Sequence, residues 1–315
     1  MLEHKNNSIS IVLPVRNGEK YLSQIKKDLD ANLDSDDELV VINDGSTDKT
    51  GEILDLWAEG NANINVLHTQ ELGLVAALNL GIKVSMHPWI ARFDVDDRYS
   101  ENRLKYQRLI INENVVAIFS DYSITNLNNR DFGIIPSGIN SHVIKLSLIS
   151  SQRTAHSSVL FRKSAVMEVG GYLESEFPAE DLGLWLRLAH QGDFLSVPET
   201  LMHYRLSEGS ISSSYREQQK LKRDILISKY GVPIESINYC NLNIKNLLNS
   251  YNSYQLPATR KLLLLQDLWK SSKEMKTLAH LLPRFVEMSR PRYWKETIRM
   301  LKHWVARKSW RVESD

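Results

Sequence analysis

The stretch SISIVLPVRNGEKYLSQIKKDLDANLDSDDELVVIND, residues 8–44, decides the fold class. Short runs rich in β-branched residues at 9–13 and 39–42 predict strands, and the segment 19–32 between them has a helical pattern. A helix between two strands indicates a βαβ unit, whose strands lie parallel in one sheet. Further helices are expected at 47–59, 72–85 and 181–191, and further strands at 64–67, 89–93 and 158–161. The sequence therefore predicts an α/β protein with a mostly parallel central sheet.

The chain changes character after this alternating region. Residues 126–140 are polar and punctuated by Gly and Pro, which is typical of a surface loop. The run SEGSISSS at 207–214 predicts a flexible connection, and the pattern beyond it is helical and basic with no strand signal. We therefore expect an α/β domain at 1–214 and a basic helical C-terminal region at 215–315.

The composition is that of a globular protein. Of 315 residues, 42% are hydrophobic and 24% charged, which excludes a disordered or collagen-like chain. The 39 Lys and Arg nearly balance the 38 Asp and Glu. Their distribution is uneven, because residues 1–100 carry a net charge of −8, residues 101–200 of −2 and residues 201–315 of +11. The near-neutral total therefore hides an acidic front and a basic rear.

Cysteine content and hydropathy bear on the compartment. Cys240 is the only cysteine, so no internal disulfide can form, and no Cys/His cluster has the spacing of a zinc site. We therefore expect a reducing, cytoplasmic setting. No run of 18 apolar residues occurs, and the start of the chain makes a poor signal peptide because an early acid precedes a short apolar run. Any membrane contact is expected to be peripheral.

Three carboxylates, Asp94, Asp96 and Asp97, follow the predicted strand 89–93. So much like charge is unfavourable unless a cation neutralises it, and Mn²⁺ or Mg²⁺ takes oxygen ligands and bridges carboxylates to phosphates. The alternative is an ordinary acidic turn. Ligands of parallel sheets bind beyond the carboxyl ends of the strands, which is where these acids lie.

A further acid, Asp44, follows the strand 39–42. Its carboxylate could accept the N–H of a nucleobase, and Arg16, after the first strand, could stack its guanidinium on the base. The alternative reading is an Asx-type turn in which Ser46 caps the next helix, and both readings can hold together.

Glu180 and Asp181 begin the helix predicted at 181–191. Acids are favourable there through the helix dipole alone. The functional reading is that Asp181 is a general base for an attacking hydroxyl. Trp185 and Leu188, four and seven residues on, are expected to anchor the helix in the core.

Several common motifs are missing from the sequence. There is no G-x-G-x-x-G after a strand and no G-x-x-x-x-G-K-[ST] loop, which argues against dinucleotide oxidoreductases and P-loop enzymes. The absence of G-x-S-x-G argues against an α/β-type serine hydrolase.

Taken together, the ordered motifs LPVRNGE, VINDGSTD, GLVAALNLGI, DVDD and ED with LWLR resemble the family-two inverting glycosyltransferases with a GT-A fold. The motifs lie at 13–19, 41–48, 73–82, 94–97 and 180–187, and the resemblance covers roughly residues 8–206. Five motifs in order are far more specific than any one of them.

The resemblance implies a role for each matching residue. Asp44 would read the uracil of a UDP-sugar, Asp181 would be the catalytic base, and Asp94 and Asp96 would hold the metal on the diphosphate. The implied nucleotide-sugar site comprises Pro14, Val15, Arg16, Asn17, Glu19, Asp44, Asn79, Asp94, Val95 and Asp96. Implied contacts to the sugar or the acceptor are Asp97, Glu180, Trp185 and Arg205.

The sequence departs from the family pattern at three places. Arg16 stands where an aromatic residue is common, and Asn43 replaces a frequent Asp. Ser207 occupies the place of a His that can approach the metal in many relatives. His156 and His203 could substitute, but a lone His is more often structural, so neither is included in the metal set.

Residues 290–315 predict a basic amphipathic helix. Its apolar side comprises Trp294, Ile298, Leu301, Trp304 and Val305, and its basic side Lys295, Arg299, Lys302 and Arg307. Such a helix lies in the plane of an anionic membrane surface or docks on the catalytic domain with a solvated basic face. Nucleic-acid binding is not expected, because the acidic front half would repel a polyanion.

The resemblance therefore implies a metal-dependent transfer of a hexose, glucose or galactose, from a UDP-sugar. The expected acceptor is a hydroxyl of a polyprenyl-diphosphate-linked saccharide in O-antigen or capsule biosynthesis, at the inner face of the cell membrane. One alternative is a sugar nucleotidyltransferase, although 14–18 does not fit its glycine-rich loop. Another is a non-catalytic peripheral membrane saccharide-binding protein, against which Asp96 and Asp181 argue.

Overall fold

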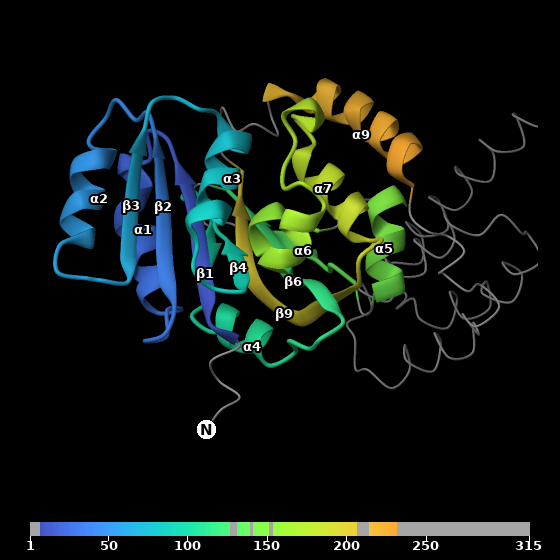
Figure 1. Ribbon diagram of the computed structural model, residues 1–315, viewed down its shortest axis with the longest axis horizontal. Helices are drawn as coiled ribbons and strands as arrows, with labels where there is room; N and C mark the ends of the chain where they lie inside the picture. The colour runs from blue at the N-terminus through green and yellow to red at the C-terminus, as the bar shows by residue number, and fades with distance from the viewer. Residues whose placement is uncertain (1–6, 127–130, 139–140, 151–153, 207–213, 232–315) are drawn as a thin grey trace, which may run out of the picture. The chain divides into compact units, whose positions relative to one another are not determined.

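The computed structural model describes residues 7–126, 131–138, 141–150, 154–206 and 214–231 (Figure 1). Contacts divide the chain into a compact unit Met1–Asn243 and a unit Ile244–Asp315. All described residues belong to the first unit, and the predicted basic helix at 290–315 lies outside them. No helix in the described ranges is both long enough and apolar enough to span a bilayer.

Nine strands of the described residues form one sheet, in the order β3-β2-β1-β4-β8-β6-β9-β5 with β7 paired to β6. The first four strands in this order are parallel to one another, as a chain of βαβ units requires. They are β1 (Ile9–Val15), β2 (Glu38–Asp44), β3 (Ile64–Thr69) and β4 (Trp89–Arg92). The others are β5 (Arg98–Tyr99), β6 (Val115–Thr125), β7 (Asp131–Ile135), β8 (Leu160–Arg162) and β9 (Asp193–Arg205).

Apolar side chains on alternate strand positions build a core on each face of the sheet. Ile11 and Leu13 of β1 belong to one cluster, and Val12 between them belongs to the other, because successive strand side chains point to opposite faces. The helices that contribute to the Ile11 cluster are α1 (Glu19–Asp30), α2 (Thr50–Ala58) and α4 (Arg103–Arg108). Those of the Val12 cluster are α3 (Leu74–Val84), α5 (Ser141–Ser150), α6 (Lys163–Glu168), α7 (Glu180–Leu188) and α9 (Arg216–Tyr230).

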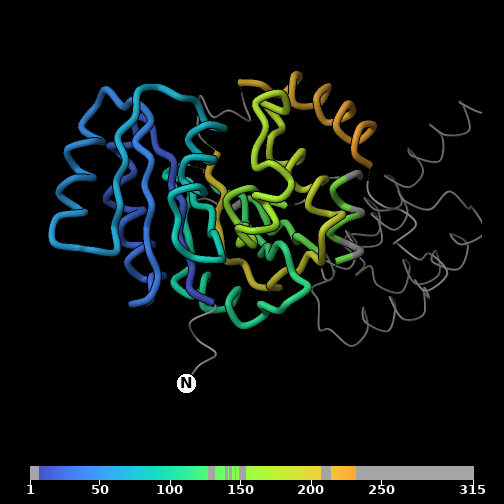
Figure 2. The backbone as a smooth tube through the Cα atoms, viewed as in Figure 1, coloured from blue at the N-terminus to red at the C-terminus, as the bar shows by residue number. Residues whose placement is uncertain are grey.

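Helix α3 approaches β1 closely because of a glycine in its interior. A Cβ built on Gly81 would lie 2.5 Å from Cγ1 of Val12, so a larger residue would push the helix from the sheet. Figure 2 shows the path of the chain, in which the segments that form β1–β3 lie on the left and α7 lies to their right. The close packing fixes the start of α3, whose Leu74 lines the cavity described below, beside the carboxyl end of β2.

The predicted α/β fold is confirmed, and the expected elements lie within a few residues of the observed ones. Two local predictions are wrong. The expected loop 126–140 contains the strand β7, whose β-branched Ile134 pairs with Ser123 of β6, so its glycine does not stop strand formation. Ser46 does not cap α2, because that helix begins at Thr50, whose N–H donates to Asp48 Oδ1 at 3.0 Å.

The helix α9 packs against α7. Its Leu226 is buried in the core, and the Tyr230 hydroxyl donates to Glu176 Oε1 at 2.7 Å. The helical pattern predicted after residue 215 is therefore confirmed for Arg216–Tyr230. The division into domains at 214 stays a prediction.

Candidate functional site

A cavity of about 480 Å³ opens at the carboxyl ends of β1 and β4. Seven of the predicted site residues line it, namely Arg16, Asn17, Asp94, Val95, Asp96, Glu180 and Asp181. The folded chain thus brings the acids after β4 and the acids of α7 to one cavity, although they lie far apart in the sequence. The lining residues that were not predicted include Tyr21, Arg92, Tyr122 and Tyr204, and His156, which was considered but not included in the metal set, also lines the cavity.

Two buried side chains, those of Tyr99 and Arg103, support the turn that carries Asp94. The backbone N–H of Asp94 donates to the Tyr99 hydroxyl at 2.7 Å. The Arg103 guanidinium lies 4.0 Å from the centre of the Phe93 ring and donates to the carbonyl of Arg92 at 2.9 Å. Burial lowers the pKa of Arg103 to about 10, so it remains a cation at neutral pH. The turn therefore has a rigid support.

Arg92, the last residue of β4, is a buried cation in the cavity wall. Its side chain is only 4% exposed and forms an ion pair with Asp94. Burial opposes the charged form, but the Asp94 carboxylate outweighs that effect and raises the pKa of Arg92 above its usual value. Arg92 therefore partly neutralises the acidic cluster.

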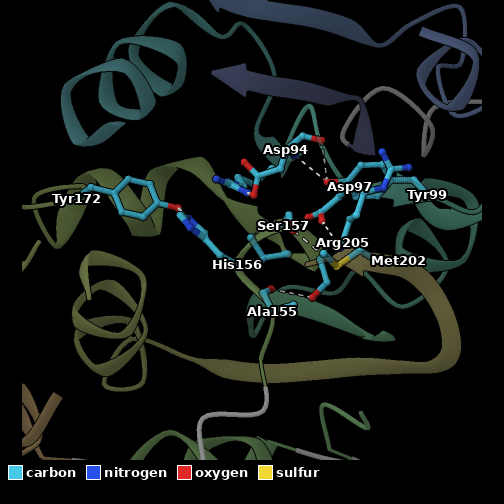
Figure 3. A network of polar contacts seen from close by, with 12 residues as sticks. Asp94, Asp97, Tyr99, Ala155, His156, Ser157, Tyr172, Met202 and Arg205 are labelled. Carbon is cyan, nitrogen blue, oxygen red and sulfur yellow. Dashed lines mark hydrogen bonds and ion pairs between the residues drawn. The ribbon is translucent and has the colours of Figure 1, made fainter. Parts of the chain in front are cut away.

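Asp97 lies beneath the cavity and is 3% exposed (Figure 3). Its carboxylate accepts the Ser157 hydroxyl at 2.5 Å and the backbone N–H of Arg205 at 2.9 Å. Burial, and then the charges of Asp94 and Asp96, raise its pKa well above the usual value. The structure thus gives Asp97 a framework role where a sugar contact was expected.

The two acids of α7 differ in their surroundings. Glu180 is 5% exposed, and burial together with the charge of Asp181 raises its pKa to about 7. Asp181 is partly exposed, and its Oδ1 accepts the backbone N–H of Leu182 at 2.7 Å. Asp181 therefore presents its carboxylate to the cavity from a fixed helix start.

Trp185 anchors α7 and does not reach the cavity. It is fully buried and meets the Phe119 ring edge-to-face with centroids 5.3 Å apart, and Leu188 is likewise buried. The expected core role of both residues is confirmed, and the expected sugar or acceptor contact of Trp185 is wrong, because its indole lies inside the core.

The two candidate histidines are engaged with protein groups. His156 lines the cavity, with Nε2 2.7 Å from the Tyr172 hydroxyl (Figure 3). Burial and then the charge of Arg92 lower the pKa of His156 well below its usual value, so the ring is neutral. The Nδ1 atom of His203 lies 2.7 Å from the Ser123 hydroxyl oxygen.

Asn17, which also lines the cavity, joins the loop after β1 to the loop after β2. Asn17 adopts φ +52°, donates its N–H to Ser46 Oγ at 2.9 Å and accepts the N–H of Thr47 at 2.8 Å. Arg16 extends past this junction and forms a two-point ion pair with Glu71, and both side chains are about half exposed. Arg16 is therefore placed at the cavity by a partner far along the chain.

Asp44 ties down the segment that leads into α3. Its Oδ1 accepts the N–H of Leu72 at 2.6 Å, and its Oδ2 accepts the N–H of Gly73 at 3.0 Å. It is 5% exposed and does not line the cavity. Next to it, the Asn43 amide Nδ2 lies 2.9 Å from His68 Nδ1, directed toward β3.

The remaining predicted residues support the framework and do not line the cavity. Pro14 and Val15 are buried in β1, and Glu19 accepts the N–H of Lys49 at 3.3 Å. The Asn79 side chain reaches the segment between α6 and α7. Its Nδ2 donates to the Tyr172 carbonyl at 2.8 Å, and its Oδ1 accepts the Tyr172 N–H at 2.9 Å. The Arg205 guanidinium lies 5.8 Å from the centre of the Tyr21 ring.

Asn79→Ala is expected to lower the free energy of unfolding by about 1–3 kcal/mol, because it leaves the Tyr172 carbonyl and N–H without their partner. Asn79→Asp is the matched comparison: it keeps the acceptor for the Tyr172 N–H but sets a carboxylate oxygen against the Tyr172 carbonyl, so its loss should be at least as large. Urea unfolding measures the free energy of unfolding. Calorimetry measures the affinity for UDP, which is expected to stay unchanged. Unchanged stability with weakened UDP binding would instead place Asn79 in a nucleotide site.

The carboxylates of the cavity suit a hard divalent cation. Within the described part of the chain, no group of three or more His, Cys, Asp or Glu side chains could enclose a metal ion. Asp94 and Asp96 offer oxygen ligands to the cavity. The pKa of Asp97 is raised by burial first and then by the negative charges of these two acids. Such a set fits Mg²⁺ or Mn²⁺ shared with substrate phosphates.

The sequence matches known proteins over its α/β region. The family model "Glycosyl transferase family 2" matches residues 10–170. An uncharacterized glycosyltransferase of Haemophilus influenzae is 26% identical over 258 residues, which are 74% of this chain and 79% of that protein. The UDP-Gal:alpha-D-GlcNAc-diphosphoundecaprenol beta-1,3-galactosyltransferase of Escherichia coli is 29% identical over 208 residues, 64% of this chain and 74% of that protein.

Solved structures share the fold. The S. aureus TarS 1-349 structure in complex with UDP-GlcNAc gives a TM-score of 0.57 at 16% identity, covering 89% of this chain and 79% of that chain. The mannosyltransferase PcManGT from Pyrobaculum calidifontis in complex with GDP-Man and Mn²⁺ gives 0.55 at 14% identity, covering 89% and 85%. At such identity these likenesses show the GT-A fold alone. Because the family model matches half of the chain, and does so across β1, β4 and the acids that follow, the chain belongs to glycosyl transferase family 2.

Proposed function

We propose that this glycosyltransferase moves a hexose, glucose or galactose, from a UDP-sugar to a hydroxyl of a lipid-diphosphate-linked saccharide, with inversion at the anomeric carbon. The observation that carries the proposal is the meeting of Asp94 and Asp96 with Asp181 in one cavity. A diphosphate-binding group and a base that line one cavity can act on the same anomeric carbon, as an in-line displacement requires.

In this reaction Asp181 removes the proton of the acceptor hydroxyl as its oxygen bonds to the anomeric carbon. The bond from that carbon to the UDP oxygen breaks, and its electron pair leaves with UDP. Asp94 and Asp96 would hold Mn²⁺ or Mg²⁺, which when bound supplies Lewis-acid neutralisation of the diphosphate. Attack opposite the leaving group inverts the configuration.

The nucleotide is proposed to lie against Arg16 and Asn17, which line the cavity beyond the metal-binding acids. The exposed guanidinium of Arg16 offers a planar cation for stacking on uracil. Asp44 could still accept a uracil N–H, since a carboxylate oxygen has two lone pairs and the Gly73 N–H engages one of those on Oδ2. Movement of the 72–73 segment would open access to it.

The acceptor class is supported by the Escherichia coli relative, whose name specifies a diphosphoundecaprenol-linked GlcNAc. We place the reaction in O-antigen or capsule biosynthesis at the inner face of the cell membrane, with the protein held peripherally by the basic segment 290–315. The basic and interfacial aromatic residues that the sequence predicts on one helix favour an anionic lipid surface.

The screen that tests the function uses the full chain with Mn²⁺, a panel of UDP-sugars and synthetic GlcNAc- or GalNAc-diphosphate-lipid acceptors. We expect one UDP-hexose to yield an extended lipid and UDP. Release of pyrophosphate from a sugar phosphate and a nucleoside triphosphate would instead indicate a nucleotidyltransferase. Saccharide binding without turnover of any donor would indicate a non-catalytic protein.

Membrane association has its own test. Replacing Lys295, Arg299, Lys302 and Arg307 with Glu in the full chain is expected to abolish flotation with phosphatidylglycerol vesicles, since each basic residue near an anionic surface contributes about 1 kcal/mol. UDP affinity, measured in parallel, stays within about twofold of the original. Undiminished flotation would remove this segment from the proposal.

A further inference from the structure

Three buried polar atoms of the cavity wall have no hydrogen-bond or ion-pair partner among the described residues. They are Nε of Arg92, Oε2 of Glu180 and Oγ1 of Thr154, and the three residues are 3%, 5% and 4% exposed. Nε is a donor and Oε2 an acceptor. Unsatisfied buried polar atoms cost free energy and are uncommon in native proteins, so a pair of opposite type on one cavity wall indicates a bound group that satisfies both.

The location of the pair specifies which part of a substrate it would meet. Arg92 contacts Asp94, which is proposed to lie at the diphosphate, and Glu180 adjoins Asp181, the proposed base. In a displacement, the anomeric carbon lies between the leaving diphosphate and the base-activated hydroxyl. The ring of the donor sugar therefore occupies the part of the cavity that these two residues border.

The charge on Arg92 favours a hydroxyl over a phosphate. One side of its guanidinium already forms an ion pair with Asp94, so the pair has little net charge to offer an anion. The remaining Nε–H is a fixed donor, because the ion pair and burial hold the planar group in place. A neutral hydroxyl both accepts from such a donor and donates to a carboxylate oxygen.

We propose that Arg92 determines the donor-sugar specificity, by donating its Nε–H to one ring hydroxyl of the hexose while Glu180 accepts from the ring on the same wall. The inference rests on the proposed function, because it takes a UDP-hexose as the ligand. Epimeric hexoses differ in the direction of one hydroxyl. A donor fixed in a buried wall rejects the epimer whose hydroxyl points elsewhere, because its own hydrogen bond is then lost.

The decisive variant is Arg92→Lys, which keeps a cation beside Asp94 but removes the Nε–H. Calorimetric titrations with UDP, UDP-glucose and UDP-galactose are made in the presence of Mn²⁺. We expect Arg92→Lys to leave the Kd of UDP within about twofold and to weaken the preferred UDP-hexose by about 10-fold, as for one hydrogen bond to a charged group. Discrimination between the two hexoses falls toward unity.

Arg98→Gln is the matched control, because Arg98 also pairs with an aspartate, Asp28, and does not line the cavity. Its titrations should match those of the wild-type protein. A further measurement uses analogues of the donor sugar. Among monodeoxy UDP-hexoses, one analogue should bind wild-type protein about 10-fold more weakly than its parent and lose nothing further in Arg92→Lys.

If Arg92→Lys weakens the binding of UDP and of UDP-hexose equally, the inference is overturned, because Arg92 then contacts the diphosphate. Unchanged binding of all three ligands would also overturn it. If Arg92→Lys fails to fold, equal binding of every monodeoxy analogue by the wild-type protein would contradict the inference in the same way. A wild-type protein that binds neither UDP nor any UDP-hexose would instead remove the proposed function, and this inference with it.

Discussion

Asp181→Asn is expected to lower kcat for sugar transfer at least about 1000-fold, within the range attributed to a positioned general base. The amide has the same size but cannot take a proton from the acceptor hydroxyl. The Kd of UDP should stay within about twofold, because the nucleotide is proposed to lie against Arg16 and Asn17, whereas the acid belongs to a different element, α7. Steady-state turnover and calorimetry measure the two quantities.

Glu180→Gln is the comparison that makes this test specific. Its carboxyl has a pKa raised to about 7, so a base role for Glu180 would make kcat fall as the pH falls through about 7, where the carboxylate gains a proton. With Asp181 as the base, Asp181→Asn abolishes turnover and Glu180→Gln retains far more of it. Turnover retained in Asp181→Asn and lost in Glu180→Gln, with that pH limb in the wild-type protein, would move the base to Glu180.

Asp96→Asn and Asp94→Asn are each expected to weaken binding of the UDP-sugar in the presence of Mn²⁺ by at least about 10-fold, because a carboxylate ligand becomes a neutral amide and loss of even an outer-shell partner weakens metal binding by about 10- to 100-fold. Chelation with EDTA should abolish turnover of the wild-type protein. Calorimetry with Mn²⁺ and with EDTA separates the two effects. Activity that is unaffected by EDTA would contradict the metal role of both residues.

Asp94→Asn should carry a second effect. Arg92 is buried and paired with Asp94, so removing the carboxylate leaves a buried cation without its counter-charge and lowers the free energy of unfolding by about 3 kcal/mol. Chemical denaturation measures this loss. The double change Asp94→Asn with Arg92→Gln should recover part of it, since the buried charge is then removed as well.

The sequence predicted the part of the site that obeys a topological rule. Residues directly after parallel strands, such as Arg16 and Asp94, meet at one edge of the sheet whatever the details of packing. Asp181 was located by its place at the start of an apolar-faced helix. These positions depend on local pattern and on strand direction, both of which can be read from one sequence.

The framework residues could not be assigned in this way, because their partners are distant in the chain. Asn79 and Asp97 have side chains that suit a ligand, yet they bond Tyr172 and Ser157, which belong to segments whose path is set by the tertiary fold. A residue that binds a ligand and a residue that supports the framework can have the same polar side chain and the same position in a motif. Only the packed structure separates a ligand contact from a support.

Arg92 is a site residue that strand alternation could have indicated. Ile90, two residues earlier in β4, packs in the core cluster that contains Trp185, so alternation places Arg92 on that face, beyond the last core position. In the folded chain Arg92 and the α7 acids line the same cavity. Strand β7 was missed for a different reason, because its glycine and flanking polar residues resemble a loop until Tyr122 and Ser123 of β6 supply a pairing edge.

The most direct test of inverting transfer is the anomeric configuration of the first product. With the donor found in the screen, NMR of the extended lipid-linked saccharide measures the coupling constant of the new anomeric proton, and the α-linked UDP-hexose provides the reference. We predict a β-linked product formed together with UDP, and none from Asp181→Asn. An α-linked product would contradict a single displacement with Asp181 as its base.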